Sequence, residues 1–205
     1  MERTIVDDIA SNKLIDKVVE VLQRGGLVVY PTETVYGLGV DATSEAALEK
    51  LWTFKGERGD KPVLVAVADV EMAEKYVNLS ELGKKVMQKY WPGAVAVVAL
   101  SNNLVARKAQ GETETLGLRN PDNKMILEII ATLGKPITST SANISGAPTA
   151  RSLAEFLQTV PAERQGLIDL YIDAGELPPR SPSTIVDTTG EEVKILRQGE
   201  VVVEV

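Results

Sequence analysis

The sequence alternates between amphipathic segments and short apolar runs, and this alternation limits the fold more than any other feature. Residues 12–23 carry apolar side chains at helical spacing, and Gly25 and Gly26 end this pattern just before the apolar run 27–30. Further helices are predicted at 44–56, 70–77, 81–90 and 123–133 and from Ser152 onward. Further strands are predicted at 63–68, 94–100, 115–119, 137–140, 170–172, 184–187, 193–196 and 201–205. Such interleaving predicts an α/β domain with one twisted mixed sheet flanked by helices.

The length of 205 residues is typical of one domain, and we expect a single domain over 1–205 because no long linker divides the chain. The first residues lack the pattern of a signal peptide, and no apolar run approaches the ~20 residues of a membrane span. We therefore expect a cytoplasmic protein. The net charge of -7 disfavours non-specific binding to nucleic acid without excluding a local basic cleft.

The chain contains neither His nor Cys, which excludes whole classes of chemistry. A Ser-His-Asp triad, a cysteine nucleophile and a zinc site built from His or Cys are all impossible within it. Any general acid–base catalysis must therefore be carried out by carboxylates, lysines, tyrosines or the substrate itself. We therefore expect phosphate chemistry performed by Lys, Arg and hydroxyl groups.

Four segments place polar or cationic groups where predicted strands and helices end, the usual position of ligands in α/β folds. Segment 31–39 takes a buried strand into two threonines, a carboxylate and glycines, although it also fits an ordinary strand-to-turn connection. Segment 55–62 carries three cations on a loop with Gly and Pro, and the alternative is a solvated charge run.

The third segment, 139–149, holds five hydroxyl side chains and one amide directly after a short strand, which favours an anion cradle over a simple polar turn. The fourth, 181–187, is followed by Arg197 after another strand, and it also fits the start of a hairpin. The Pro-rich stretch 175–182 before it fits a rigid active-site loop or a surface loop equally well. None of these segments is a Walker A loop or a Rossmann fingerprint.

Taken in order, these segments resemble the YrdC family of threonylcarbamoyl-adenylate synthases, from about Asp8 to Arg197. The resemblance rests on Pro-Thr-Glu-Thr-Val-Tyr-Gly-Leu from Pro31, the Lys-Gly…Lys-Pro loop from Lys55, and Ser-Ala-Asn-Ile-Ser-Gly from Ser141. It also includes Pro-Ser-Thr-Ile-Val-Asp from Pro182 and the late Leu196-Arg197. The family resemblance implies a twisted α/β domain with a deep concave cleft.

The resemblance also implies an activity, in which L-threonine, bicarbonate and ATP are condensed to threonylcarbamoyl-AMP and pyrophosphate. A separate complex would then transfer the threonylcarbamoyl group to tRNA. Mg²⁺ would be held mainly by the ATP phosphates, and no protein metal site is expected. Two alternatives stay open: a YrdC-like paralogue with an altered substrate, and a non-catalytic RNA-binding module with weak tRNA contact.

By position, the resemblance implies a threonine site and an ATP site. The threonine site would comprise Thr34, Arg119, Ser139 and Ser183. The ATP site would comprise Lys55, Arg58, Lys61, Thr115, Ser141, Asn143, Thr149 and Arg197. No covalent nucleophile is implied, and Lys55 and Arg58 are the candidate charge stabilisers.

The chain departs from the family pattern at one important position. The family commonly has Lys-x-Arg, but here Glu57 follows Lys55 by two residues and Arg58 comes next. Either Arg58 replaces the missing cation, or ATP binding is weakened or altered. Ala66 stands where several longer members have His, a residue that short members also lack.

Overall fold

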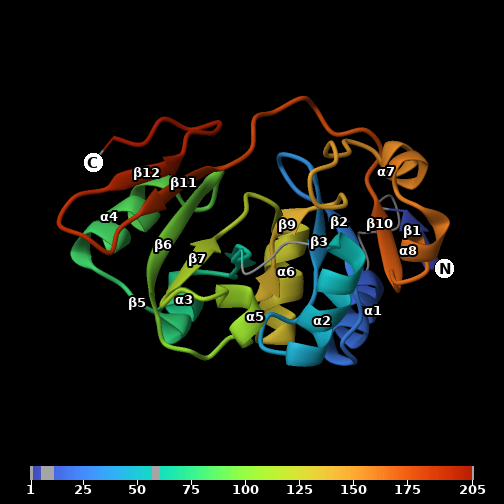
Figure 1. Cartoon of the computed structure of the whole chain (residues 1–205), viewed down its shortest axis with the longest axis horizontal. Coiled ribbons are helices and arrows are strands. Elements are labelled where there is room, and N and C mark those ends of the chain that lie inside the picture. The colour runs from blue at the N-terminus through green and yellow to red at the C-terminus, as the bar shows by residue number, and fades with distance from the viewer. Residues whose placement is uncertain (1, 6–11, 57–60, 205) are drawn as a thin grey trace.

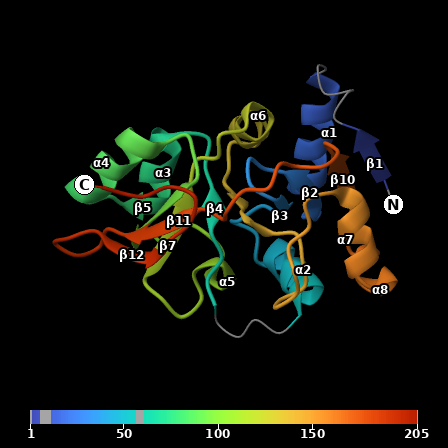
Figure 2. The same ribbon diagram turned by 90° about the horizontal axis from the view of Figure 1, so that it is seen from above.

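The computed structural model describes residues 2–5, 12–56 and 61–204, and its strands form two sheets that lie side by side (Figures 1 and 2). The first sheet has the order β1 (Glu2–Ile5), β10 (Leu170–Asp173), β2 (Val28–Pro31), β3 (Tyr36–Gly39), β9 (Thr140–Ser141). The second has the order β12 (Lys194–Arg197), β11 (Thr184–Asp187), β6 (Val95–Ser101), β7 (Thr115–Arg119), β4 (Val65–Ala66), β8 (Ile137–Thr138), and β5 (Val77–Asn78) pairs with β6. Both sheets mix parallel and antiparallel neighbours, which confirms the mixed α/β class but gives two sheets where one was expected.

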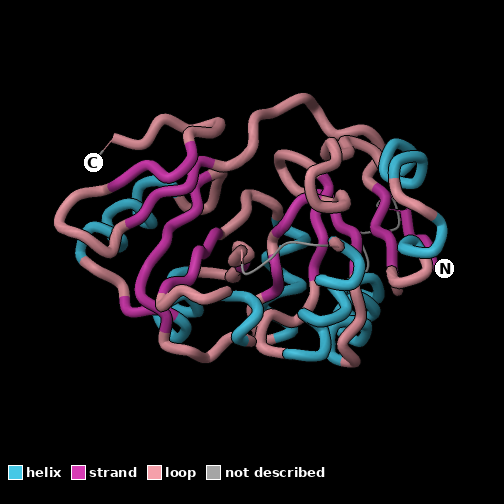
Figure 3. Tube along the Cα trace, in the orientation of Figure 1, coloured by secondary structure: helices cyan, strands magenta, loops and turns pink. Residues whose placement is uncertain are grey.

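Helices cover these sheets and connect their strands (Figure 3). They are α1 (Asn12–Gln23), α2 (Glu45–Lys55), α3 (Val70–Tyr76), α4 (Glu81–Tyr90), α5 (Arg107–Gln110), α6 (Lys124–Leu133), α7 (Leu153–Thr159) and α8 (Ala162–Gln165). Ser44, Asn123 and Ser152 each accept a hydrogen bond from a backbone N–H three residues on, at 3.1–3.3 Å. Ser44 and Ser152 cap the helices predicted to start there, whereas Asn123 caps α6 although the prediction made it the first helical residue. Ser11, which precedes the predicted helix at 12–23, lies outside the described residues.

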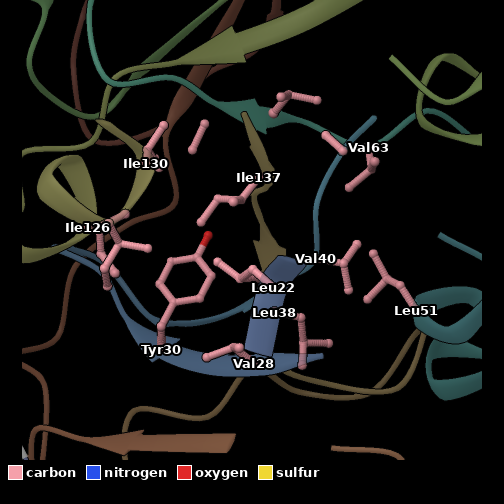
Figure 4. Packing of buried hydrophobic residues seen from close by; sticks show 14 of the residues in the cluster. Leu22, Val28, Tyr30, Leu38, Val40, Leu51, Val63, Ile126, Ile130 and Ile137 are labelled. Atoms are coloured by element: carbon pink, nitrogen blue, oxygen red, sulfur yellow. The ribbon is translucent and has the colours of Figure 1, made fainter. Parts of the chain in front are cut away.

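Three strands of the first sheet, β10, β2 and β3, are buried along their whole length. Alternate residues of a strand point to opposite sides, so both faces of these strands are covered. In β10, Ile172 faces Val18 of α1 and Ile126 of α6. Its neighbour Tyr171 packs edge-on against Phe156 of α7, which in turn stacks on Phe54 of α2. Figure 4 shows the core around Tyr30. Burial on both faces explains why these strands appear in the sequence as short continuous apolar runs.

Strand β3 was not expected, because its sequence Tyr-Gly-Leu-Gly suggests a turn. The glycines instead make room for an aromatic ring from the neighbouring strand. A Cβ atom on Gly39 would lie 2.8 Å from Cε1 of Tyr30, and one on Gly37 would lie 3.1 Å from its Cζ. The two glycines therefore allow the Tyr30 ring to lie flat beneath the strand that leaves the 32–35 turn.

The second sheet carries one cross-strand row that becomes important for the site. Arg197 of β12 pairs with Ile185 of β11, Ile185 with Ala96 of β6, and Ala96 with Arg119 of β7. Residues paired in this way point to the same face of a sheet. The register therefore places the two arginines on one face, with Ala96 and Ile185 between them.

The two sheets meet at Ser139. A single strand was predicted over 137–140, but the chain leaves the second sheet after Thr138 and enters the first at Thr140. The Ser139 N–H donates to Leu64 O at 2.7 Å, which continues the register of β8 with β4 by one residue before the chain turns to the first sheet. The polar segment that begins at Ser139 therefore lies where the sheets diverge.

Other differences from the expected elements are small. The strand expected at 63–68 is limited to β4, and β1, β5, α5 and α8 were not expected. Residues 201–204 do not form the expected strand. The carbonyl of Val201 accepts a hydrogen bond from the side-chain hydroxyl of Thr184 in β11, which is not a backbone ladder bond. Within the described ranges, no helix has the length and apolar character needed to cross a membrane.

Candidate active site

A pocket of about 400 Å³ lies between the two sheets and gathers residues from both. Its first wall comes from the turn between β2 and β3, and its second from the face of the second sheet that carries the cross-strand row. The segment that follows β10 crosses from the first sheet to β11 of the second (Figure 1), and its residues Arg180, Pro182 and Ser183 line the pocket. The predicted site residues that line it are Thr34, Arg119, Ser139, Ser141, Thr149, Ser183 and Arg197.

Arg119 ends β7 inside the pocket and is 5% exposed. One of its Nη atoms forms an ion pair with Oε1 of Glu33, whose side chain is 8% exposed. Arg119 Nε and Glu33 Oε2 have no hydrogen-bond partner among the described residues. The pair is therefore balanced in charge but incomplete in hydrogen bonding.

The turn that carries Glu33 is organised by Thr32. Its hydroxyl donates to Val35 O at 2.7 Å and accepts from the N–H groups of Thr34 and Val35 at 3.1 and 3.2 Å. This is the local backbone bonding that an ordinary turn would have. It also leaves the Thr34 side chain lining the pocket, 3.1 Å from the Thr32 hydroxyl.

Tyr30 supports this wall from behind. Its hydroxyl donates to Thr138 O at 3.0 Å, next to Ser139. Burial raises the pKa of the Tyr30 phenol from 10.0 to about 12, and a side-chain hydrogen bond with Ser139 opposes that shift. Tyr30 is therefore a neutral donor near neutral pH.

Arg197 approaches the pocket from the other end of the cross-strand row and is exposed to solvent. Its Nε and an Nη atom both donate to Ser183 O, at 3.1 and 2.8 Å. The pKa of Arg197 is lowered by partial burial of the guanidinium and by the positive charge of Arg119. The group remains protonated at physiological pH, because arginine starts from a very high value.

Gly199 holds the chain after Arg197 tightly against Ser183. A Cβ atom at Gly199 would lie 2.0 Å from Pro182 O, so no other residue fits without a backbone shift. Two hydrogen bonds secure the contact: Glu200 N–H donates to Pro182 O, and Gly199 N–H donates to the Thr184 hydroxyl. The position of Arg197 is thus fixed by backbone contacts on both sides.

Lys55 and Asn143 lie beside the pocket without lining it. Lys55 is 3% exposed, and its Nζ donates to Ser141 O and to Asn143 Oδ1, both at 2.9 Å. The Ser141 hydroxyl donates to the same Asn143 oxygen at 2.8 Å. In this arrangement Lys55 holds the Ser-Ala-Asn turn, and its predicted contact with ATP stays a prediction.

Two of the remaining predicted ATP residues, Lys61 and Thr115, do not line the pocket. Lys61 is exposed, and Arg58 lies outside the described residues. Thr115 begins β7, four residues before Arg119, and points to the same face of the sheet. Between them, Leu64 lies over Gly117, with its Cδ2 2.5 Å from where a Cβ would be. Leu64 therefore separates Thr115 from the pocket.

Arg180 is the clearest lining residue that the sequence did not assign. It lies in the Pro-rich stretch 175–182 and lines both this pocket and a shallower hollow next to it. Three arginines, Arg119, Arg180 and Arg197, thus face a common space in a chain of net charge -7. None of the described residues that line the pocket is Asp or Glu. The pocket is suited to an anion.

Comparison with known proteins identifies the family of the chain. Residues 20–199 match the sequence profile of the Sua5/YciO/YrdC family, which is described as "Telomere recombination". The chain belongs to the Sua5/YciO/YrdC family.

Individual relatives extend this family match to nearly the whole chain. A threonylcarbamoyl-AMP synthase from Pyrococcus abyssi is 33% identical over 87% of this chain and 52% of that protein. One from Vibrio vulnificus is 31% identical over 90% of this chain and 98% of that protein. The crystal structure of P. abyssi Sua5 complexed with L-threonine superposes with a TM-score of 0.85 at 30% identity, covering 97% of this chain and 56% of that one. The chain thus spans about half the length of the P. abyssi proteins and nearly all of the Vibrio protein.

Proposed function

We propose that this chain is an L-threonylcarbamoyladenylate synthase, a nucleotidyltransferase that makes threonylcarbamoyl-AMP for tRNA threonylcarbamoyladenosine (t6A) modification. One observation carries the proposal. A single pocket brings the four predicted threonine residues, Thr34, Arg119, Ser139 and Ser183, together with three predicted ATP residues, Ser141, Thr149 and Arg197. The activity for which the Pyrococcus and Vibrio relatives are named supports the same assignment.

The reaction needs no protein nucleophile, which agrees with a chain that lacks His and Cys. The threonine amine attacks bicarbonate or the CO₂ derived from it, giving a carbamate with loss of water. A carbamate oxygen then attacks the α-phosphate of ATP, forming the mixed anhydride as pyrophosphate leaves. The protein contributes position and charge: Arg119 on the threonine carboxylate, and Arg197 on the phosphates.

ATP enters this scheme as its Mg²⁺ complex. The pocket wall offers hydroxyl groups and guanidinium groups rather than carboxylates. Oxygen ligands for Mg²⁺ would therefore come from the phosphates and from water, as is usual for this ion. In this proposal Mg²⁺ is part of the substrate rather than a resident metal.

Lys55, Arg58, Lys61, Thr115 and Asn143 have secondary places in the proposal. Asn143 and Lys55 shape the turn that presents Ser141. Arg58 and Lys61 would add cations at the ATP end. Displacing Leu64 from Gly117 would join the pocket to Thr115 along one face of β7.

The test is to incubate the protein with L-threonine, labelled bicarbonate, Mg-ATP and pyrophosphatase. We expect labelled threonylcarbamoyl-AMP and a threonine-dependent release of phosphate. Arg197→Ala should lower the rate, whereas Lys194→Ala, which removes an exposed cation from the same strand, should not. Absence of product above an enzyme-free blank would refute the proposal.

The same assay separates the alternatives. A paralogue with an altered substrate would release phosphate with another amine or carbamoyl compound and not with L-threonine. An RNA-binding module would retard tRNA in a gel at sub-micromolar concentration, with a strong salt dependence. We place the reaction in the cytoplasm, where a separate complex would take the adenylate and transfer its threonylcarbamoyl group to tRNA.

A further inference from the structure

Arg119 lines the pocket, and its ion-pair partner Glu33 lies directly behind that wall. Thr32 and Thr34, on either side of Glu33 in the chain, both line the pocket, as does Arg119. The side chains of the pair are 8% and 6% exposed. Burial of two charges is costly unless their hydrogen bonds are well satisfied. Burying this pair beside a ligand cavity therefore costs folding free energy.

The hydrogen bonds of this pair are not satisfied within the described chain. Glu33 Oε2 accepts no bond and Arg119 Nε–H donates none, and both atoms are buried. Most buried polar side-chain atoms in folded proteins have a partner, so each orphan requires an explanation. One free acceptor on an anion and one free donor on a cation form a two-point receptor. Its complement is a ligand with a donor of positive charge next to an acceptor of negative charge.

An α-amino acid has this pattern, because its ammonium and its carboxylate are attached to the same carbon. A plain carboxylate would meet an arginine that is already neutralised by Glu33. An ammonium placed elsewhere in the pocket would face Arg119, Arg180 and Arg197, and no lining residue among those described is acidic. Tyr30 cannot supply the missing charge, because its pKa is raised to about 12. Among the residues that the structure describes, Glu33 is thus the carboxylate that pairs with a lining arginine.

We propose that Glu33 is a substrate-binding residue whose free carboxylate oxygen receives the α-ammonium group of the amino-acid substrate, while Arg119 receives its carboxylate. This inference rests on the proposed function, since it takes the substrate to be L-threonine. It adds a residue to the threonine site and explains the orphaned atoms. It also makes the Glu33–Arg119 pair the element that selects a zwitterion over a simple acid, and it holds the substrate nitrogen in place.

The experiment compares three ligands by isothermal titration calorimetry in the presence of Mg-ATP. They are L-threonine, 3-hydroxybutyrate, which lacks the ammonium, and threoninol, which lacks the carboxylate. We expect Glu33→Gln to weaken L-threonine and threoninol by about 10- to 100-fold, as for loss of a charge-assisted hydrogen bond. The affinity for 3-hydroxybutyrate should stay within about twofold of wild type or rise, because Arg119 is no longer neutralised. Glu49→Gln, an exposed glutamate that pairs with Lys108, is the matched control and should change none of them.

An equal loss for L-threonine and 3-hydroxybutyrate, or no loss for L-threonine, would overturn the inference. Circular dichroism checks that Glu33→Gln is folded. If it is not, Glu33→Asp keeps the charge with a shorter reach, and the same selective loss for the two ammonium ligands is expected from it. Selective loss in a protein that makes no adenylate would contradict only the proposed function. Wild-type protein that binds no L-threonine would contradict both.

Discussion

Arg119 and Arg197 occupy the same cross-strand row and face the same pocket, but their surroundings differ in almost every respect. Arg119 is buried and paired with Glu33, and its Nε has no partner within the described residues. Arg197 is exposed and is held by a neutral carbonyl, that of Ser183. Its pKa is lowered by partial burial and by Arg119, whereas Arg119 has a carboxylate beside it.

The difference indicates two kinds of recognition within one pocket. The Arg119 end carries almost no net charge and suits a ligand that is itself neutral overall, such as a zwitterion. The Arg197 end, with Arg180 near it, has two arginines that form no ion pair with a carboxylate of the described residues, and it suits a polyphosphate. Substitutions at the two ends should therefore affect different quantities.

Arg119→Ala should have the largest effect on stability, because it leaves Glu33 buried without a counter-ion. We expect the free energy of unfolding in urea to fall by about 3–5 kcal/mol. The double variant Arg119→Met with Glu33→Gln should regain most of this loss while remaining unable to bind threonine. A loss below about 1 kcal/mol in the single variant would show that the pair is not buried as the structure has it.

Arg197→Gln should act on nucleotide binding rather than on stability. Arg197 is an exposed residue, so we expect a change of less than about 1 kcal/mol in the free energy of unfolding. Loss of a charged contact to phosphate should weaken ATP by about 10- to 100-fold in calorimetry. Lys194→Gln is the control on the same strand. Equal losses of ATP affinity in the two variants would show that Arg197 has no specific role in binding the phosphates.

Tyr30, behind the Arg119 end, should make stability depend on alkaline pH. Because burial raises its pKa from 10.0 to about 12, the unfolded chain loses the phenol proton first. The stabilisation is fully present below pH 10 and is lost as the pH rises toward 12. Between pH 9 and 11 we expect a loss of about 1 kcal/mol from this group.

Tyr30→Phe isolates this contribution, because the pKa of Tyr171 is also raised to about 12 by burial and affects wild type and variant alike. Urea unfolding of both proteins at pH 9 and pH 11 gives the difference. Equal slopes with pH would contradict the burial of the Tyr30 hydroxyl.

Arg180→Ala should have the smallest effect, since its side chain is exposed on the segment between the sheets. Exposed charged contacts contribute about 0.2–1 kcal/mol, so the KM for ATP should rise no more than about fivefold. The effect should shrink in high salt, because exposed charges are screened. Lys13→Ala, on α1, serves as the control. A larger effect that persists in salt would move Arg180 from the rim to the centre of the ATP site.

Structural features that depend on residues close together in the chain were predicted from the sequence. Features that depend on contacts between residues far apart in the chain were not. Helices α2, α6 and α7 begin one residue after the predicted starts at Ser44, Asn123 and Ser152, and β7 covers the expected residues. The break at Ser139 and the strand β3 depend on partners elsewhere: Leu64 for the first, and the Tyr30 ring for the second. No local pattern distinguishes such cases from an ordinary strand or turn.

The site follows the same rule. Hydroxyl-rich and cationic segments were visible in the sequence, and seven of the predicted residues do line one pocket. The pairing of Arg119 with Glu33 joins positions 86 residues apart, and nothing in either segment indicates it. Arg180 was hidden in a stretch that fitted a surface loop equally well. Lys55 has the burial and bonds of a residue that holds a turn.

The row from Arg197 through Ile185 and Ala96 to Arg119 sets the distance between the two arginines in steps of one strand. Three strand-to-strand steps separate the arginines, or about 14 Å between backbones at ~4.8 Å a step. Side-chain substitutions can alter reach by fractions of an ångström, but this separation changes only by adding or removing a strand. A slip of one residue in β11 would turn its pocket-facing side chains to the opposite face. A ligand much longer or shorter than this span would thus require a new topology rather than new side chains.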